Sequence, residues 1–433
     1  MNTSRRNARG EASLQRILQS TVQLVGRYGF DNTTIARIVK ATDRPASSIY
    51  WFFENKDELI AAALESSYSK QAPSRRPWEE FSPKRPLLDQ LREELEPELR
   101  ASESEDPLRL GIMLALEGSA ADSKVQEPFR RRRAAAQRRI EAWWAGAFSA
   151  RAADTGDRSA GIEWMGRLTL AFLDGHYISD VVADDRDAAQ RSTILAHALA
   201  GAFDVVARQP PSAAFELPPC EHPRPEGSTP EADGEGGNNL LHVTRALVAE
   251  HGYEGATMSR ICAASGMKRS SVYWRHKDKD TLIKAAVAEP FVGLLAPFLV
   301  LPNPTDDWLH DLSYALETFM SEVLNHPDTV KAGLLLKLQR WDPPTSGGST
   351  VLAGTALAEE RLADWFKEVL PEAEGKNSIR VHLAWTVARL CEGLMLGSAL
   401  GRTVAPQAVA GILVPMLTKP LDHWLATTTH GAQ

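Results

Sequence analysis

The chain repeats one stretch of its own sequence more than two hundred residues further along. Residues 28–64 align without a gap on residues 251–287, and the pentapeptides SSIYW (47–51) and SSVYW (270–274) are the clearest part of the match. Internal repeats at this distance mark a duplicated structural unit. The fold must therefore contain the same small unit twice. Identical pairs include Gly29 with Gly252, Thr34 with Thr257, Arg37 with Arg260 and Lys56 with Lys279.

Each copy reads as a series of short helices. Apolar residues ahead of each repeat recur at three- and four-residue spacing, which is typical of the buried face of a helix. Gly29 and Gly252 follow these helices as stop signals. Thr34 and Thr257 then stand where a side-chain oxygen caps a second helix. The two apolar faces contain Leu14, Ile17, Leu18 and Val25, and Leu240, Leu247 and Val248.

A tight turn separates the second helix from a third in both copies. Asp43 and Gly266 occupy this turn, and both residue types tolerate positive φ. The third helix carries the repeated pentapeptide, and a fourth begins near Lys56 or Lys279. Two short helices joined by such a turn make a helix-turn-helix, whose second helix enters the DNA major groove. On pattern alone, another small three-helix domain is an open alternative.

The charge distribution follows the repeat. The whole chain carries a net charge of −7, which by itself argues against nucleic-acid binding. Residues 1–76, however, hold 12 Lys and Arg against 7 Asp and Glu, and residues 238–289 hold 8 against 5. A basic surplus confined to the two repeated segments indicates that these segments, and not the rest of the chain, face DNA.

The two copies resemble the DNA-binding domain of the TetR family of bacterial transcriptional regulators. The resemblance covers about fifty residues in each copy and rests on the threonine cap, the turn, the tyrosine and the Lys-Asp-x-Leu that follows. The second copy is closer at the turn because it keeps Gly266, whereas Pro45 opens the third helix of the first copy. The first copy keeps an aromatic residue at Phe53, where the second has His276.

The resemblance implies roles for individual residues. Thr34, Thr257, Tyr50, Tyr273, Lys56 and Lys279 would contact phosphates, which fix register without reading sequence. The third helices would read base edges. For Trp51 and Trp274, packing on the first helix is the alternative to DNA contact, and for Arg5, Arg6 and Arg9 the alternative to a minor-groove contact is a solvated tail. The expected DNA-binding residues are Thr34, Arg44, Pro45, Ser47, Ser48, Tyr50, Trp51 and Lys56 in the first copy, and Thr257, Lys268, Arg269, Ser270, Ser271, Tyr273, Trp274 and Lys279 in the second.

The duplication continues beyond the DNA-binding heads. RRIEAWW (138–144) faces ERLADWF (360–366), and LAFLDGHYI (170–178) faces ARLCEGLML (388–396). Residues 209–237 hold seven prolines and a run of acids, a composition typical of an extended linker. The sequence therefore predicts an all-α chain in six parts. These are a disordered basic tail (1–10), a first helix-turn-helix domain (11–70), a first helical ligand-binding and dimerisation domain (78–208), the linker (209–237), a second helix-turn-helix domain (238–289) and a second helical domain (290–428).

Members of this family ordinarily act as symmetric dimers, so a chain with both units is expected to form a pseudo-dimer with itself. The expected seam is a four-helix bundle from 161–183, 190–208, 378–400 and 405–426. The third helices differ, DRPASSIYW against GMKRSSVYW, so we expect an operator with two unlike half-sites. Further pairing of pseudo-dimers on DNA stays open.

The resemblance also implies a small-molecule effector, held by the helical domains. Large apolar residues are mostly core, and core packing is the alternative for every candidate. A mostly apolar cavity with few polar anchors would suit a lipid-like ligand. The arginine run 130–133 would either bind an anionic head group or form a solvated face. The effector-binding candidates are Met113, Trp143, Trp164, Phe172, His176, Trp341, Trp365, Trp385 and Met395.

The remaining patterns set limits on other functions. The sequence has neither a nucleophile elbow nor a phosphate-binding loop, so we predict no enzyme and no cofactor. Three scattered cysteines indicate a reducing compartment, and Cys220 with His222 lacks the further ligands that a metal site needs. No apolar run spans a membrane, so a cytoplasmic bacterial protein is expected. The alternative to a ligand-released repressor is a regulator that acts through protein contacts, with one head inactive on DNA.

Overall fold

The structure is a computed structural model that describes residues 2–70, 78–100, 107–118, 124–151, 158–179, 185–208, 235–339, 344–370 and 379–430. Every regular element in these ranges is a helix, which confirms the predicted all-α class. The first half supplies α1 (Asn2–Asn32), α2 (Ile35–Thr42), α3 (Ala46–Tyr50), α4 (Lys56–Lys70), α5 (Leu87–Glu98), α6 (Pro107–Leu116), η2 (Lys124–Gln126), α7 (Glu127–Arg151), α8 (Ser159–Ile178) and α9 (Asp185–Val206).

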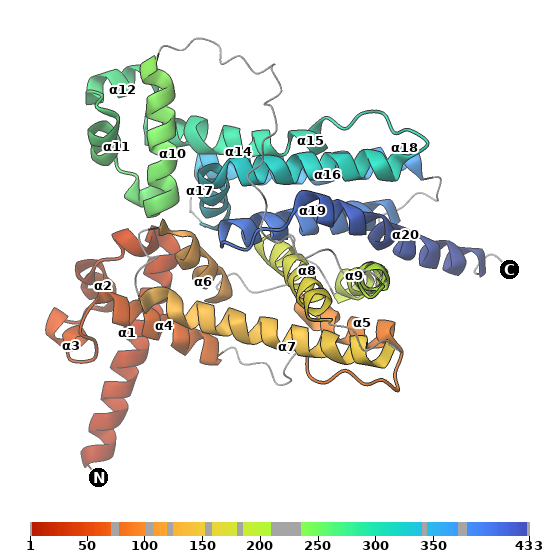
Figure 1. The fold of residues 1–433 in the computed structure, drawn as a ribbon. Coiled ribbons are helices and arrows are strands. Elements are labelled where there is room, and N and C mark those ends of the chain that lie inside the picture. The colour runs from red at the N-terminus through yellow and green to blue at the C-terminus, as the bar shows by residue number, and fades with distance from the viewer. Residues whose placement is uncertain are drawn as a thin grey trace.

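The second half repeats the order of the long helices, but the counterpart of α4 is interrupted by a π-helical turn and followed by an additional short helix. Figure 1 shows the two heads at one end of the molecule and the C-terminus at the other. The second half contains α10 (Glu235–Gly255), α11 (Met258–Ser265), α12 (Arg269–Arg275), α13 (Lys279–Ile283), η3 (Lys284–Ala288), α14 (Glu289–Leu294), α15 (Ala296–Leu299), α16 (Trp308–Asn325), α17 (Pro327–Leu338), α18 (Ser346–Val369), α19 (Ile379–Ala399) and α20 (Pro406–His430).

The structure describes the predicted tail but only the last residues of the predicted linker. Residues 2–10, expected to be a disordered tail, are helical and continue α1. They contain no proline, so a helix nucleated by the packed turns of α1 propagates back through them. The linker at 209–237 lies outside the described residues up to 234, and residues 235–237 open α10.

Each head has a small core of its own. In the first, Ile38 of α2 and Ile49 of α3 are buried with Ile17 and Leu59. In the second, Ile261 of α11 and Val272 of α12 occupy the matching positions, together with Leu240 and Leu282. The apolar positions shared by the two repeats are therefore the ones that hold each helix-turn-helix to its first and fourth helices.

The two helical bodies share one continuous core, and the four helices expected at the seam pack against each other, α8 on α19 and α9 on α20. Gly175 and Gly393 sit where α8 and α19 cross. A Cβ built on Gly175 would overlap the carbonyl oxygen of Arg389, and one built on Gly393 would overlap that of Ala171. The two glycines let the helix backbones touch, so the crossing distance depends on both.

The described helices do not meet the requirements for crossing a bilayer. None of them combines the length and the apolar character that a membrane crossing needs.

Candidate nucleic-acid interface

The first head builds its helix-turn-helix from local signals. The Thr34 hydroxyl caps α2 by accepting a hydrogen bond from the Arg37 amide at 3.2 Å. Asp43 then adopts the left-handed conformation with φ 53°, which the backbone needs to turn sharply between the two helices. Pro45 opens α3 with the φ of −64° that its ring favours. With Ile49 turned into the core, Ser47 and Tyr50 face outward.

The second head uses the same devices with different residues. Thr257 caps α11 by accepting from the Arg260 amide at 3.2 Å, and Gly266 makes the turn with φ 69°. The helix that follows, α12, has 7 residues where α3 has 5. Its first turn exposes Lys268 and Arg269, where the first head has Pro45 and an alanine. The outward faces of α3 and α12 therefore have the same backbone arrangement but carry different charges.

The largest aromatic surfaces exposed on the described part of the molecule lie at the ends of α3 and α12. Trp51 is 77% exposed and Trp274 is 86% exposed, with Tyr50 at 55% and Tyr273 at 39%. The structure therefore excludes the alternative that these tryptophans pack on the first helix of each head. Because both heads leave a tryptophan exposed at the matching position, these surfaces are the candidate interface.

The other predicted DNA-binding residues differ in their exposure. Thr34, Pro45, Ser47, Thr257 and the four residues Lys268 to Ser271 are exposed, while Arg44, Ser48, Lys56 and Lys279 are partly buried. All sixteen belong to the helix-turn-helix units or to the residue that opens the following helix.

Two of these residues, Lys56 and Lys279, turn back into their own heads. The Lys56 ammonium donates to the Phe30 carbonyl at 2.9 Å and lies over the Phe30 ring at 3.8 Å. Lys279 donates to the Tyr253 carbonyl at 3.0 Å and lies over the Tyr253 ring at 4.2 Å. Burial lowers the pKa of both lysines. Each ammonium closes the carbonyl end of the head's first helix, where a cation is favoured, instead of pointing outward to a phosphate.

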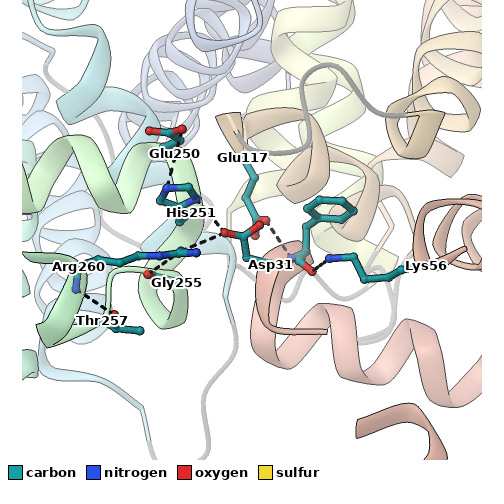
Figure 2. Close-up of polar contacts among 9 residues, drawn as sticks. Asp31, Lys56, Glu117, Glu250, His251, Gly255, Thr257 and Arg260 are labelled. Carbon is teal, nitrogen blue, oxygen red and sulfur yellow. Dashed lines mark hydrogen bonds and ion pairs between the residues drawn. The ribbon is translucent and has the colours of Figure 1, made fainter. Parts of the chain in front are cut away.

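A polar junction joins the two heads, and the sequence motifs did not predict it. Asp31, just past the bend of α1, lies 2.8 Å from His251 Nδ1 and 3.1 Å from Arg260 Nη1, both in the second head. Figure 2 shows these groups converging from the two ribbons, with Glu117 beside them. The sequence offers one sign of this difference between the heads, because the alignment places Tyr28 opposite His251.

Glu117 is buried beneath this junction, and its environment disfavours the charge. Its Oε2 accepts a hydrogen bond from the Phe30 amide at 2.9 Å, and its side chain also borders Gly29 and Gly252. Burial raises the pKa of Glu117 from 4.5 to about 7, although the Phe30 amide and Lys56 favour the ionised form. The carboxyl therefore changes its charge near neutral pH.

We expect the free energy of unfolding of the wild-type protein to fall between pH 5 and pH 8, and we expect Glu117→Gln to remove this fall. Below pH 4.5 both the folded and the unfolded carboxyl hold the proton, and above it the unfolded chain releases its proton first, so folding becomes less favourable until about pH 7. The full effect is roughly 3 kcal/mol. Urea unfolding of both proteins at pH 5 and pH 8 measures it.

Glu58→Gln is the matched control. The Glu58 carboxylate also accepts from a backbone amide, that of Glu54 at 2.7 Å, but it is exposed. An equal loss of pH dependence in both variants would refute the assignment to Glu117.

The effector candidates are mostly core residues. Met113, Trp143, Trp164, Phe172, Trp365, Trp385 and Met395 are all at most 5% exposed, and Trp341 lies outside the described residues. Trp143 packs edge-on against Trp78 and Trp144. Trp365 donates its indole N–H to the Pro302 carbonyl at 2.9 Å. These residues fill space between helices, as large apolar side chains usually do.

His176 and Met395 have different surroundings. His176 lies at the seam with its ring 6.1 Å from that of Trp385, and burial together with Arg389 and Arg191 lowers its pKa to about 4. Met395 lines a small hollow with Phe298 and Leu362. Of the candidate set, Met395 alone appears in the lining of that hollow.

The arginine run 130–133 is held by the protein. Arg130 donates to Gln126, and Arg131 pairs with Glu65 at 2.8 Å. Arg132 lies over the Tyr68 ring at 4.7 Å, and Arg133 pairs with Asp174. Two of these contacts reach α4, so the run ties the first head to α7 rather than forming a free anion site.

Comparison with known proteins identifies the repeated unit. The family model described as bacterial regulatory proteins, tetR family, matches residues 17–63 and again residues 240–286. An uncharacterised HTH-type transcriptional regulator of Mycobacterium bovis is 32% identical over 112 residues, which cover 26% of this chain and 52% of that protein.

Two proteins named as repressors match over shorter regions. An HTH-type transcriptional repressor of Mycobacterium tuberculosis is 34% identical over 82 residues, covering 16% of this chain and 43% of the relative. The repressor AcnR of Corynebacterium glutamicum is 40% identical over 50 residues, covering 12% and 27%. The chain spans about half the length, or less, of these curated relatives. The two matches fall in the two copies of the internal repeat, so each copy is similar to the domain that this tetR family model describes, and the chain carries that domain twice in one polypeptide.

Proposed function

We propose that this chain is a transcriptional regulator whose two heads bind one DNA operator with two unlike half-sites. The observation that carries the proposal is the pair of exposed reading helices, α3 and α12, at the same end of the molecule (Figure 1). An α-helix of this kind fits the major groove, where base pairs differ in their hydrogen-bonding groups. Because two relatives are named repressors, repression is the proposed mode.

The unlike half-sites follow from the residues that open each reading helix. The first head offers Arg44, Ser47 and Ser48, of which Ser47 is exposed, and the second offers Lys268, Arg269, Ser270 and Ser271, all exposed. The second head has more exposed cationic donors, which suit the N7 and O6 acceptors of guanine. We therefore assign the more guanine-rich half-site to the second head.

Phosphate contacts would come from the exposed edges of both heads. Thr34 and Thr257 stand at the N-termini of α2 and α11, where backbone amides and the helix dipole favour an anion. Tyr50 and Tyr273 are exposed beside them. Lys56 and Lys279 are assigned instead to closing the first helix of each head, because their ammonium groups already have carbonyl partners.

The proposed effector is a small, mostly apolar molecule, and we assign it to the second half because Met395, one of the candidate residues, borders a small hollow there. The walls include Leu295, Phe298 and Leu362. Glu392 and Arg389 also line it, with Glu392 Oε2 3.4 Å from Arg389 Nη1, so a ligand there would be oriented by a charged pair. Such a ligand releases DNA only if it binds better to a conformation in which the heads are misplaced.

The direct test is footprinting on the DNA upstream of the chain's own coding region, at several salt concentrations, with the mass of the complex. We expect one chain per site, an asymmetric protected region and a loss of affinity of ~10³-fold between 50 and 200 mM salt. Two identical half-sites would contradict the asymmetry. Protection of a single half-site would favour the alternative, in which one head no longer binds DNA.

A further inference from the structure

The two heads touch each other directly, at the ends of α1 and α10. Both helices bend at a glycine with positive φ, Gly29 at 72° and Gly252 at 69°. The bend in α1 brings the residues that follow Gly29 against the second head, where Asp31 meets His251 and Arg260 (Figure 2). The contact therefore joins the two DNA-binding units without passing through the helical bodies.

The contact is made once and not twice. Alignment makes Glu254 the counterpart of Asp31, and Tyr28 and Arg37 the counterparts of His251 and Arg260. Glu254 instead pairs with Lys279 at 3.4 Å, and Arg37 lies over the Tyr28 ring at 4.2 Å. A symmetric dimer would make such a contact in both directions or in neither. The one-sided contact is thus a property of the fused chain.

Both sides of the contact are anchored to rigid parts of the fold. On the first side, the residue before Asp31 has its amide bonded to Glu117 and its carbonyl bonded to Lys56. On the second side, Arg260 belongs to α11, and its Nη1 also donates to the Gly255 carbonyl at 3.1 Å. The Asp31 and His251 side chains are 20% and 18% exposed and Arg260 is 47% exposed, so the Asp31 side of the contact is partly shielded from water and salt.

We propose that the Asp31 contact with His251 and Arg260 holds α3 and α12 at one separation and so selects the spacing between the two half-sites. The inference rests on the proposed function, since it requires both heads to bind one DNA. Adding one base pair lengthens the operator by ~3.4 Å and rotates one half-site against the other. Heads that move independently can shift to reach the displaced half-site. Heads joined through Asp31 can reach it only if the contact with His251 and Arg260 breaks.

The test compares operator spacing in the wild-type chain, Asp31→Asn and Arg260→Gln. The substrates are the footprinted operator and versions with one or two base pairs added or removed between the half-sites. We expect wild type to lose at least ~30-fold in affinity for each change of one base pair. Asp31→Asn and Arg260→Gln are expected to lose fivefold or less, with affinity for the native spacing reduced less than threefold. Glu11→Gln, which removes one exposed charge from the same helix, should behave like wild type.

A second measurement needs no DNA. Spin labels at Lys40→Cys and Ala263→Cys, which are exposed and equivalent in the two heads, report the head-to-head distance once Cys220 and Cys262 are replaced with serine. We expect one narrow distance distribution in wild type and a broad one in Asp31→Asn.

The outcomes separate the two proposals. Equal distance distributions in wild type and Asp31→Asn would overturn the inference, whatever the DNA results. Equal spacing penalties in the three proteins would also overturn it. Failure of the chain to bind any operator would overturn the proposed function, while the distance distributions would still report on the contact between the heads.

Discussion

Gly393→Ala is expected to destabilise the protein by at least about 3 kcal/mol, because the added methyl group has no space at the crossing of α8 and α19. It would overlap the carbonyl oxygen of Ala171, which is backbone and cannot rotate away. In a helix without such a neighbour, the same change would stabilise by about 0.5–1 kcal/mol. The position therefore reverses the usual sign of a glycine-to-alanine change. Denaturant unfolding at constant pH measures the difference.

Gly411→Ala supplies the matched control for this prediction. Gly411 is also helical, in α20, but a Cβ there meets no atom within 4 Å. We expect a small gain in stability for Gly411→Ala and a large loss for Gly393→Ala. Equal unfolding midpoints for the two variants would show that the seam opens at little cost. Gly175→Ala, on the opposite helix, should repeat the loss because its Cβ would overlap the Arg389 carbonyl oxygen.

Exchanging the opening of the first reading helix for that of the second should change which operator the chain prefers. The exchange replaces residues 43–46, DRPA, with the GMKR of residues 266–269. We expect a preference for a palindrome of the second half-site and a loss of about 100-fold on the native operator. That loss corresponds to one to three mismatched base pairs at about 1–3 kcal/mol each. Selection from a randomised operator library measures both.

The fold should accept this exchange. Asp43 already has φ 53°, a conformation that glycine adopts readily, and the core residue Ile49 is left in place. The control is Ile49→Val, which introduces the core residue of the second head without changing any exposed residue. It should keep the native preference. If the exchanged chain kept that preference too, base reading would have to come from outside residues 43–46.

Part of this protein was determined by its sequence alone, wherever the signal is local. The caps at Thr34 and Thr257, the turns at Asp43 and Gly266 and the buried Ile49 and Val272 each depend on residues within one or two helical turns. The alignment of the two copies added the duplication, which no single copy reveals. The seam helices were predicted from the resemblance to the TetR family, whose members ordinarily pair as dimers, and their apolar faces supply the packing.

The tertiary structure decided what depends on segments that meet from far along the chain. It turned Lys56 and Lys279 inward, left Trp51 and Trp274 exposed, and placed the candidate effector residues mostly in the core. It also brought Asp31 to Arg260 and buried Glu117 between the heads, although these residues lie in three separate segments. Periodicity and spacing describe the faces of one helix. The charge state and the partners of a side chain depend on which helix faces pack together. In this protein, the packing between the two halves determines both.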